Sequence, residues 1–561
     1  MSLKFRIIEK CYQNAKGKPS NGADFLLEKD GWNDYGYLVM YHLHATYNLT
    51  GKGNEYLGAI RIMKKGQQEY KQNVLEEDLG GYDFVDLPED YVSLSASIDL
   101  YDSLANMLSV KDRESFVKQL HLIFDEDSKF YDASLRDDEC FNKALLRDIT
   151  FDNFALGRGK ALMLNIAFVY NLREQAIRVG FANCDETLTL NFSCLSDCDS
   201  EQIPNGVIAF IGKNGSGKST AIYNLAKIIY ANPDQRFRLK DAVGILTPNN
   251  LGISRLFIVS YSPFDNFVLP GIGGEDYQLL LNGIENGTGR FVFCGIRDIQ
   301  REFDDILKNP DPDTYEKLFE KHRQTKTCLK PLESLANEFD TSMNMLMKDE
   351  SRLALWNEVK DKAKVLFPEI SLVMSELFET DNKILSFQRQ STGYKFFLHS
   401  LSRIIAYIDN NSIILFDEPE NHIHPPMLSF MMSILRLVLS RYKLVMLVAT
   451  HSPVVLQETF AKNVFVVRGN GSSCNISHPL IETYGASISE IVSEVFDLTT
   501  DVTNYYNAYE ALYDKWNEQE NWESIDDMLN SFSCHLGESI SSQLVSYLIN
   551  LYVSRHPEML N

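Results

Sequence analysis

The sequence has no long apolar run. No stretch reaches the roughly 18 to 20 consecutive apolar residues that a membrane-spanning helix needs. The nearest candidate, residues 427–440, is shorter and carries Arg436, so we expect a buried amphipathic helix there. The N-terminal segment also lacks the apolar core of a secretory signal. These two absences predict a cytoplasmic protein without a membrane partner.

Cysteine is sparse and scattered, with nine residues in a chain of 561. The nearest approach to a cluster is Cys184, Cys194 and Cys198, but no fourth ligand stands at the spacing of a zinc site. Buried free thiols are therefore the favoured interpretation. We expect neither a disulfide nor a structural zinc ion.

Basic residues are fewer than acidic residues in this chain. The chain has 54 Lys and Arg against 77 Asp and Glu, a formal net charge of −23. This argues against a protein that coats nucleic acid by itself, because non-specific binding comes mainly from basic side chains that neutralise phosphates. The overall charge does not exclude a local basic patch on the surface. The hydrophobic fraction of 44% indicates a globular chain, and its length allows roughly three to five folding units.

The strongest motif is GKNGSGKS at 212–219, which fits the phosphate-binding pattern G-x-x-x-x-G-K-[ST]. An apolar strand at 207–211 precedes it, and apolar residues at helical spacing follow over 220–230. Glycines let backbone N–H groups surround phosphates, Lys218 can reach the β- and γ-phosphates, and Ser219 can ligate Mg²⁺. The candidate residues of this loop are Gly212, Asn214, Gly215, Gly217, Lys218, Ser219 and Thr220.

A second motif is an apolar strand at 413–416 that ends in Asp417 and Glu418. A carboxylate at the end of a buried strand can hold Mg²⁺, and a neighbouring glutamate can polarise an attacking water. By itself such a pair is about as often a turn that caps a helix. Its occurrence downstream of the phosphate loop favours the metal-binding interpretation.

A third buried strand, 443–449, leads to His451. A histidine at a strand end can hydrogen-bond a γ-phosphate, although a lone histidine there is usually structural. The fourth segment contains Ser391 and Gly393, which open a predicted helix 24 residues before Asp417. Ser and Gly at a helix N-terminus can bind phosphate, but the pair is a weak signal alone.

In this order the four segments resemble the ATPase heads of the ABC type, in the soluble branch of chromosome-maintenance (SMC), double-strand-break-repair and OLD-type proteins. The strings ATHSP and DEPENHIHP are most similar to the OLD-like subset. The features are also similar to PtuA proteins, the ATPase subunits of Septu and retron anti-phage systems. The resemblance covers residues 160–270 and 385–485, and it implies ATP and Mg²⁺ as cofactors.

The resemblance also implies roles for individual residues. Lys218 and Ser219 would hold phosphate and Mg²⁺, Asp417 would be the second Mg²⁺ partner, and Glu418 would be the catalytic base. His451 would act as the switch histidine near the γ-phosphate.

Ser391 and Gly393 would complete the site of a second subunit, so the resemblance predicts a head-to-head dimer or higher oligomer. The chain departs from the family at two places. The family's signature usually reads L-S-x-G-[EQ], whereas here Arg389 and Gln390 precede Ser391 and Tyr394 follows Gly393. The strand 256–261 is followed by Ser262 to Asp265, where the family usually has a glutamine.

The predicted fold class is α/β: an ABC-type P-loop NTPase head, a mixed sheet with helices, with added modules. AIRVGFA and TLTLNFSCL, between 176 and 195, predict an antiparallel strand pair. The expected division is an N-terminal α+β module at 1–155, an ATPase lobe at 156–275, a helical insert at 276–385, a second ATPase lobe at 386–485 and a C-terminal helical partner-docking segment at 486–561.

OLD-type nucleases carry a metal-dependent domain after the head, which needs a glutamate and a D-x-D pair. The residues after 486 contain no D-x-D, and the nearest pair, Asp526 and Asp527, is adjacent. We therefore expect an ATPase without nuclease activity of its own.

The favoured hypothesis is a regulatory or sensor subunit of a bacterial anti-phage complex that controls a separately encoded effector, such as an HNH nuclease or a toxin. The alternative is an SMC- or RecF-like DNA-repair ATPase that clamps DNA. A transporter ATPase is a weaker third, because its docking needs membrane partners.

Overall fold

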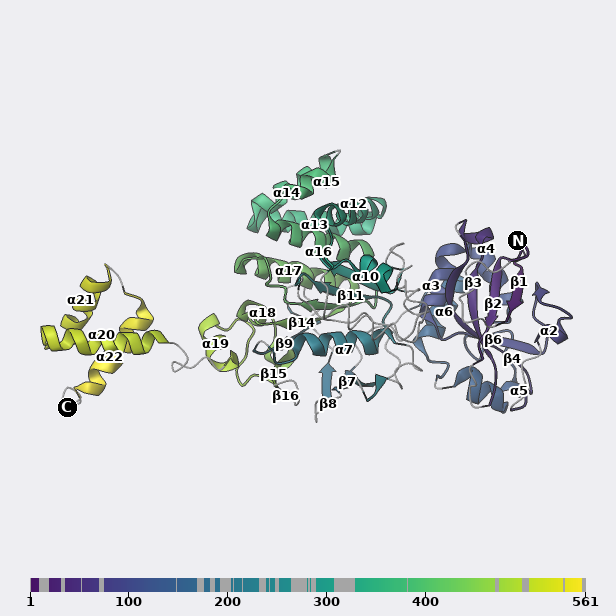
Figure 1. The fold of residues 1–561 in the computed structure, drawn as a ribbon, viewed down its shortest axis with the longest axis horizontal. Helices are drawn as coiled ribbons and strands as arrows, with labels where there is room; N and C mark the ends of the chain where they lie inside the picture. The colour runs from purple at the N-terminus through teal and green to yellow at the C-terminus, as the bar shows by residue number, and fades with distance from the viewer. Residues whose placement is uncertain are drawn as a thin grey trace. The chain divides into compact units, whose positions relative to one another are not determined.

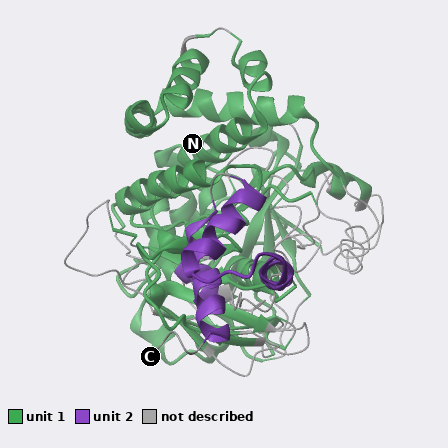
Figure 2. Ribbon diagram, turned by 90° about the vertical axis from the view of Figure 1, so that its left-hand side faces the viewer, with its two compact units in different colours: residues 1–488 green, residues 489–561 purple. Residues whose placement is uncertain are grey.

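The computed structural model divides the chain into two compact units, residues 1–488 and 489–561 (Figures 1 and 2). It describes residues 2–9, 20–31, 36–51, 53–69, 75–147, 149–168, 176–181, 187–191, 203–204, 206–213, 215–231, 239–241, 243–247, 252–263, 280, 283, 289–306, 328–380, 382–469, 474–496, 504–537 and 540–556. Among these residues no helix is both long enough and apolar enough to cross a membrane.

The first unit begins with a six-stranded sheet in the order β5-β1-β2-β3-β4-β6. All its strand pairs are antiparallel except β1 with β2. Its strands are β1 (Phe5–Ile8), β2 (Phe25–Lys29), β3 (Met40–Ala45), β4 (Glu55–Lys64), β5 (Asp83–Phe84) and β6 (Tyr91–Leu94). The helices of this module are α1 (Tyr47–Thr50), α2 (Leu75–Asp78), α3 (Ile98–Met107), α4 (Val110–Gln119), α5 (Ala133–Arg136), the π-helix η1 (Phe141–Leu146) and α6 (Phe154–Leu164).

Helix α6 moves the boundary of the N-terminal module. The sequence predicted an end at 155, inside this helix. In the structure α6 packs on α3 and α4, and Met163 lies in the same core as Leu104 and Phe116. A Cβ at Gly159 would lie 2.5 Å from the ring of Tyr101, so only glycine permits this close approach of α6 to α3. The module therefore extends through α6.

A seven-stranded central sheet follows, in the order β12-β11-β13-β14-β9-β15-β16. All neighbours are parallel except β15 and β16. The strands are β9 (Val207–Ile211), β11 (Leu256–Ser260), β12 (Phe291–Gly295), β13 (Ile413–Asp417), β14 (Val445–Thr450), β15 (Val464–Gly469) and β16 (Cys474–Ser477). Because the strands are parallel, their carboxyl ends meet at one edge of the sheet.

Alternate residues of the central strands enter two different cores, as the period of two requires. Ile413 and Leu415 join the core beneath α7 (Lys218–Tyr230), whereas Ile414 and Phe416 join the core on the opposite face. Figure 1 shows α7 on one side of the sheet and α16 and α17 on the other. The central sheet is thus the middle of three layers, which explains why its strands are apolar throughout.

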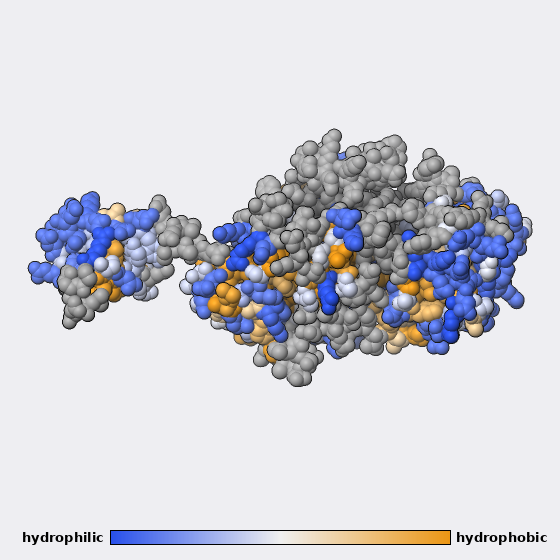
Figure 3. Space-filling model, turned by 90° about the horizontal axis from the view of Figure 1, so that it is seen from below, coloured by the Kyte–Doolittle hydropathy of each residue, from blue (hydrophilic) through white to orange (hydrophobic). Residues whose placement is uncertain are grey.

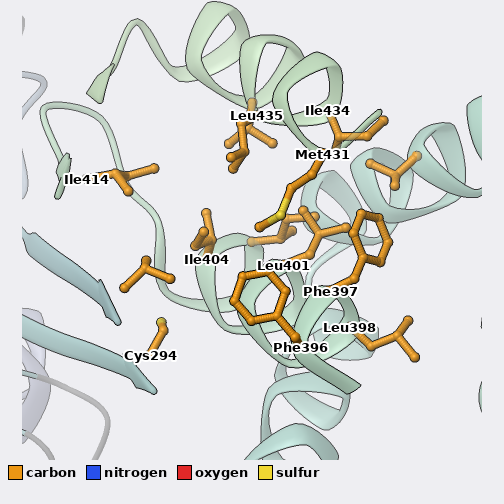
Figure 4. Packing of buried hydrophobic residues seen from close by; sticks show 14 of the residues in the cluster. Cys294, Phe396, Phe397, Leu398, Leu401, Ile404, Ile414, Met431, Ile434 and Leu435 are labelled. Atoms are coloured by element: carbon orange, nitrogen blue, oxygen red, sulfur yellow. The ribbon is translucent and has the colours of Figure 1, made fainter. Parts of the chain in front are cut away.

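The second core is formed mainly by helices that follow β12. In Figure 4, Phe396 and Leu401 of α16 lie close to Met431 of α17 and to Cys294 of β12. The helices on this side and around the strand ends are α10 (Ile299–Ile306), α12 (Leu332–Lys348), α13 (Glu350–Leu366), α14 (Pro368–Glu379), α15 (Lys383–Gln388), α16 (Thr392–Tyr407), α17 (Pro425–Tyr442), α18 (Pro453–Gln457) and the 3-10 helix η4 (Ala461–Asn463).

The predicted helical insert at 276–385 needs correction. Its residues 291–295 form β12, a fully buried strand that pairs in parallel with β11. Helices α12, α13 and α14 bury Phe339, Trp356 and Met374 in the same core as α16. The segment is therefore part of the sheet and of its helical cover. The helix-like residues 313–323 lie outside the described part of the chain.

A small antiparallel sheet, β10-β7-β8, confirms the predicted strand pair. Its strands are β7 (Ala176–Phe181), β8 (Thr187–Asn191) and β10 (Gly244–Thr247). Ile177 and Leu190 join the core that contains α7. This sheet therefore covers the helix that follows the phosphate loop.

The second unit is helical. Helix α19 (Ile488–Phe496) begins at the boundary, and α20 (Asn504–Glu520), α21 (Ile525–Leu536) and α22 (Ser542–Arg555) follow. An aromatic core joins the last three helices through Tyr513, Trp516, Phe532 and Tyr552. The face seen in Figure 3 is mostly hydrophilic. With 13 Asp and Glu against two Lys and Arg, residues 489–561 carry −11 of the total charge of −23.

Candidate functional site

The phosphate loop connects the end of β9 to the N-terminus of α7. Gly215 and Gly217 have φ values of +80° and +98°, a left-handed conformation that side chains with a Cβ rarely adopt. A Cβ at Gly212 would lie 2.3 Å from the carbonyl oxygen of Val467, so glycine is required there by close approach. Thr220 is exposed in the first turn of α7, and Asn214 lies outside the described residues.

Lys218 folds back over the loop. Its Nζ donates to the carbonyl oxygens of Gly212, at 2.8 Å, and Lys213, at 3.1 Å. Burial lowers the pKa of this amine, while Glu418 and Asp417 oppose the shift. Exchange of the two carbonyl partners for phosphate oxygens would give the ammonium group stronger, charge-assisted bonds.

Asp417 joins the acidic strand to the phosphate loop. Its Oδ1 accepts a hydrogen bond from Ser219 Oγ at 2.8 Å, and its Oδ2 accepts one from Tyr223 Oη at 2.6 Å. The carboxylate and hydroxyl that the sequence proposed as magnesium ligands are therefore in contact. Oxygen donors of this kind are what Mg²⁺ prefers. Tyr223, four residues after Ser219 on the same face of α7, was not predicted.

Glu418 has a left-handed backbone, with φ +50°. Its N–H donates to the carbonyl oxygen of Ala449 at 2.8 Å, which ties the turn to β14. Its Oε2 accepts a bond from Asn421 Nδ2 at 2.9 Å, and its side chain is 28% exposed. Glu418 is thus held in an unusual backbone conformation at the carboxyl edge, with its carboxylate accessible to a water molecule.

His451 follows β14 directly and is 46% exposed. Its Nδ1 lies 3.0 Å from Glu420 Oε1 and 3.8 Å from Glu418 Oε1. The same oxygen of Glu420 accepts bonds from the His451 backbone N–H and from Thr450 Oγ1. The structure therefore groups the two acids of the strand end with the histidine. Glu420 was missed, because a third acid in an acidic turn carries no signal of its own.

Two buried polar atoms at this edge point to a ligand. Ser216 Oγ and Glu420 Oε2 have no hydrogen-bond partner within the described part of the chain. Buried polar atoms in native proteins are normally satisfied, by protein groups or by water and ligands. Together with the loop N–H groups, the site fits a phosphate with its bound water and Mg²⁺. Among the described residues no group of three or more His, Cys, Asp or Glu side chains is arranged to hold a metal ion by itself.

The predicted signature lies at the start of α16. Ser391 is the N-cap of this helix and accepts a bond from the Tyr394 N–H at 3.3 Å. A Cβ at Gly393 would lie 3.0 Å from the carbonyl oxygen of His422, in the turn that follows the acidic strand. Ser391 and Thr392 are exposed. The structure thus gives this segment a place beside that turn and an accessible helix N-terminus.

A buried polar network lies next to the site at the end of β11. Tyr261 Oη contacts His399 Nδ1 at 2.6 Å, and His399 Nε2 contacts Glu338 Oε2 at 3.0 Å. Lys330 and Arg403 lie 2.7 and 3.7 Å from Glu338 oxygens. We call these five residues the Tyr261 network. It joins the strand end beside Asp417 to α12 and α16.

The charges of this network are set by burial and by mutual contact. Burial lowers the pKa of His399 to about 4, although its bond to Glu338 acts in the opposite direction. Burial would raise the pKa of Glu338, but Lys330, Arg403 and His399 outweigh it and hold that pKa below its ordinary value. The histidine is thus neutral between an ionised carboxylate and a tyrosine hydroxyl. Asp265, which follows the strand in sequence, lies outside the described residues, as do Cys184, Cys194 and Cys198.

The family model described as AAA ATPase domain matches residues 293–456 of the chain. This segment runs from β12 to α18, so it contains Asp417, Glu418 and His451 but not the phosphate loop. The chain is also similar to Protein ea59 of Escherichia phage lambda, with 26% identity over 515 residues, which are 88% of this chain and 92% of that protein. An AAA-type ATPase domain is therefore present, on an α/β fold.

Proposed function

We propose that this protein binds and hydrolyses ATP and that its ATPase state controls a separate effector. The observation that carries the ATPase proposal is the contact of Ser219 with Asp417 at 2.8 Å. It brings the phosphate loop and the acidic strand, 198 residues apart in sequence, to the same edge of the sheet. The match of the AAA ATPase domain to residues 293–456 supports the same conclusion.

The residues of the site suggest separate roles in binding phosphate, holding Mg²⁺ and activating water. Backbone N–H groups of the loop, the N-terminus of α7 and Lys218 would bind the phosphates. Mg²⁺, when held by Ser219 and Asp417, would supply positive charge at the phosphate oxygens. Glu418 would orient the attacking water, and His451 would donate a hydrogen bond to the γ-phosphate.

The head would act as a dimer. Ser391 is exposed at the N-terminus of the 16-residue helix α16, so its end is accessible to a phosphate held by a second copy. Two nucleotides would then lie between two heads, each bound by one loop and one signature. Hydrolysis would release the contact, which gives the molecule two states that a partner can distinguish.

We further propose that the effector binds the C-terminal unit. Residues 489–561 have their own aromatic core and a net charge of −11, so a basic partner would be attracted there. An anti-phage role with an HNH nuclease or toxin as effector, as in PtuA-like systems, agrees with the OLD-like motifs. The similarity to a protein of phage lambda adds a phage-related setting.

A DNA-clamping ATPase is the second candidate. Residues 1–488 carry 52 basic and 64 acidic side chains, a net charge of −12, so any DNA contact would need a local basic surface on the head. This candidate predicts ATP-dependent DNA binding that weakens steeply with salt. The charge balance favours the effector hypothesis.

The experiment has two parts. ATPase activity of the purified chain is measured first, with Lys218→Ala as the control that should be inactive. The chain is then isolated from its natural host with bound proteins, with and without ATP, and the partners are identified by mass spectrometry. A chain that hydrolyses ATP, brings down no effector and binds DNA only with ATP would favour the clamp. A wild-type chain without nucleotide binding would refute both candidates.

A further inference from the structure

We infer that Glu420 is a positioning residue that holds His451 in the orientation needed to bind the γ-phosphate. This inference rests on the proposed ATPase function and extends it to a residue that neither the motifs nor the comparisons assign. Glu420 lies three residues beyond Asp417, in the turn after β13. Its side chain is 11% exposed.

Glu420 bridges the ends of two neighbouring strands. Its Oε1 accepts a bond from Thr450 Oγ1 at 2.8 Å and one from the His451 N–H at 2.7 Å. Thr450 is the buried last residue of β14, which pairs with β13 up to Asp417 and Ala449. The carboxylate of Glu420 therefore fixes the backbone of His451 relative to the acidic strand.

The same carboxylate also orients the imidazole ring. Glu420 Oε1 lies 3.0 Å from His451 Nδ1, whereas the nearer oxygen of Glu418 lies 3.8 Å away. This contact is an ion pair when the imidazole ring is protonated, and a protonated ring carries a hydrogen on both nitrogens. Nε2–H is then the donor that a phosphate oxygen can reach on this half-exposed side chain. Carboxylates that orient a functional histidine through its other nitrogen are a recurrent device.

The arrangement also separates the roles of the two glutamates. Glu418 has its Oε2 bonded to Asn421 and lies farther from the ring, so it is available to water. Glu420 Oε2 is buried without a hydrogen-bond partner among the described residues. Its Oε1 accepts two hydrogen bonds, from Thr450 Oγ1 and the His451 N–H, and lies 3.0 Å from His451 Nδ1, so this carboxylate is committed to holding its neighbours. Glu418 would thus act on the water and Glu420 on the histidine.

Histidine-selective ¹⁵N NMR tests the contact itself in the full chain. The His451 signal, identified by its loss in His451→Ala, should show a hydrogen on Nδ1 and should shift in Glu420→Gln. A matched control is Glu482→Gln, since Glu482 also accepts backbone N–H bonds, from Ala461 and Thr483. That variant should leave the His451 signal in place. A His451 signal unchanged by Glu420→Gln would overturn the inference, whether or not the chain hydrolyses ATP.

Steady-state kinetics test whether loss of the contact between Glu420 and His451 slows ATP hydrolysis. Loss of an outer partner of a functional group typically costs on the order of 10- to 100-fold, so we expect Glu420→Gln to lower kcat by that factor. Affinity for ADP, which lacks the γ-phosphate, should stay within about twofold. The double variant with His451→Ala should be no slower than His451→Ala alone, since both act through one contact. Losses that multiply would contradict a role through His451, and a wild-type chain that binds no ATP would refute the proposed function instead.

Discussion

The hydroxyl of Tyr223 donates to Asp417 Oδ2 at 2.6 Å, while Ser219 occupies the other carboxylate oxygen. Both partners of the carboxylate come from the first turns of α7, and Asp417 is 5% exposed. The orientation of the acidic side chain is thus set by the helix that follows the phosphate loop. Any Mg²⁺ bound here would find the Asp417 carboxylate already held in one orientation by Ser219 and Tyr223.

Tyr223→Phe should therefore weaken magnesium binding. The lost bond goes to a charged acceptor, which is worth about 1.5 to 3 kcal/mol. We expect the Mg²⁺ concentration for half-maximal ATPase activity to rise about tenfold, while nucleotide binding without Mg²⁺ stays unchanged. Tyr230→Phe, a tyrosine at the other end of α7, is the control. An unchanged magnesium titration for Tyr223→Phe would show that Ser219 alone orients the carboxylate.

Lys218→Ala should abolish nucleotide binding. The ammonium group is buried over the loop and is the one cation of the GKNGSGKS motif aimed at its carbonyl groups. Its loss would remove charge-assisted bonds to the phosphates. Fluorescent ATP binding measures the effect, and circular dichroism checks that the variant is folded. Retention of wild-type affinity would place the nucleotide elsewhere.

Glu418→Gln should keep nucleotide binding and stop turnover. The amide can still accept the bond from Asn421, so the turn should persist, but it cannot polarise water as a carboxylate does. We expect kcat to fall by on the order of 10²- to 10⁴-fold and the ATP-bound dimer to accumulate. Light scattering with and without ATP follows the dimer. Unimpaired hydrolysis would remove Glu418 from the role of base.

Lowering the pH should decrease the free energy of unfolding of the first unit, because His399 resists protonation in the folded state. Its folded pKa is about 4, against an ordinary value of about 6.5. As the pH falls from about 6.5 toward 4, the unfolded histidine takes up a proton that the folded one refuses, so the free energy of unfolding decreases. Glu338, whose folded pKa is also lowered, acts in the same direction at lower pH.

His399→Gln provides the measurement for this pH effect. Thermal unfolding of wild type and His399→Gln from pH 8 to pH 5 should show that the stability difference between them shrinks on acidification. Tyr261→Phe, which removes the hydroxyl partner of His399 but keeps the histidine, should retain the slope of the wild type. A difference independent of pH would mean that His399 titrates normally in the folded protein.

The sequence predicted the elements of the site whose signal is local. The strand at 207–211 and the helix after Lys218 are present, because a buried strand, a glycine turn and a helical period are visible within a few residues. The acidic strand and the strand before His451 are present for the same reason. Their alignment at one edge follows from the parallel pairing, which sequence indicates only indirectly.

The missed features depend on long-range contacts. Residues 291–295 are four apolar residues and a glycine, and such a short run does not distinguish a strand from a helix; pairing with β11 makes it a strand. His399 and Glu338 lie on different helices, 61 residues apart, and neither has a motif. Tyr223 and Glu420 acquire their roles only when α7 and the turn after β13 meet Asp417 and His451.

Strand β12 has a consequence for the modularity of the chain. The segment between the phosphate loop and α16 contributes a strand to the central sheet before it enters the helices, and those helices share one core with α16 and α17. It is therefore not a removable cassette. A truncation or domain graft that treats 276–385 as a separable insertion would take an edge strand and half of a hydrophobic core with it, whereas the boundary at 488 offers a natural point of division.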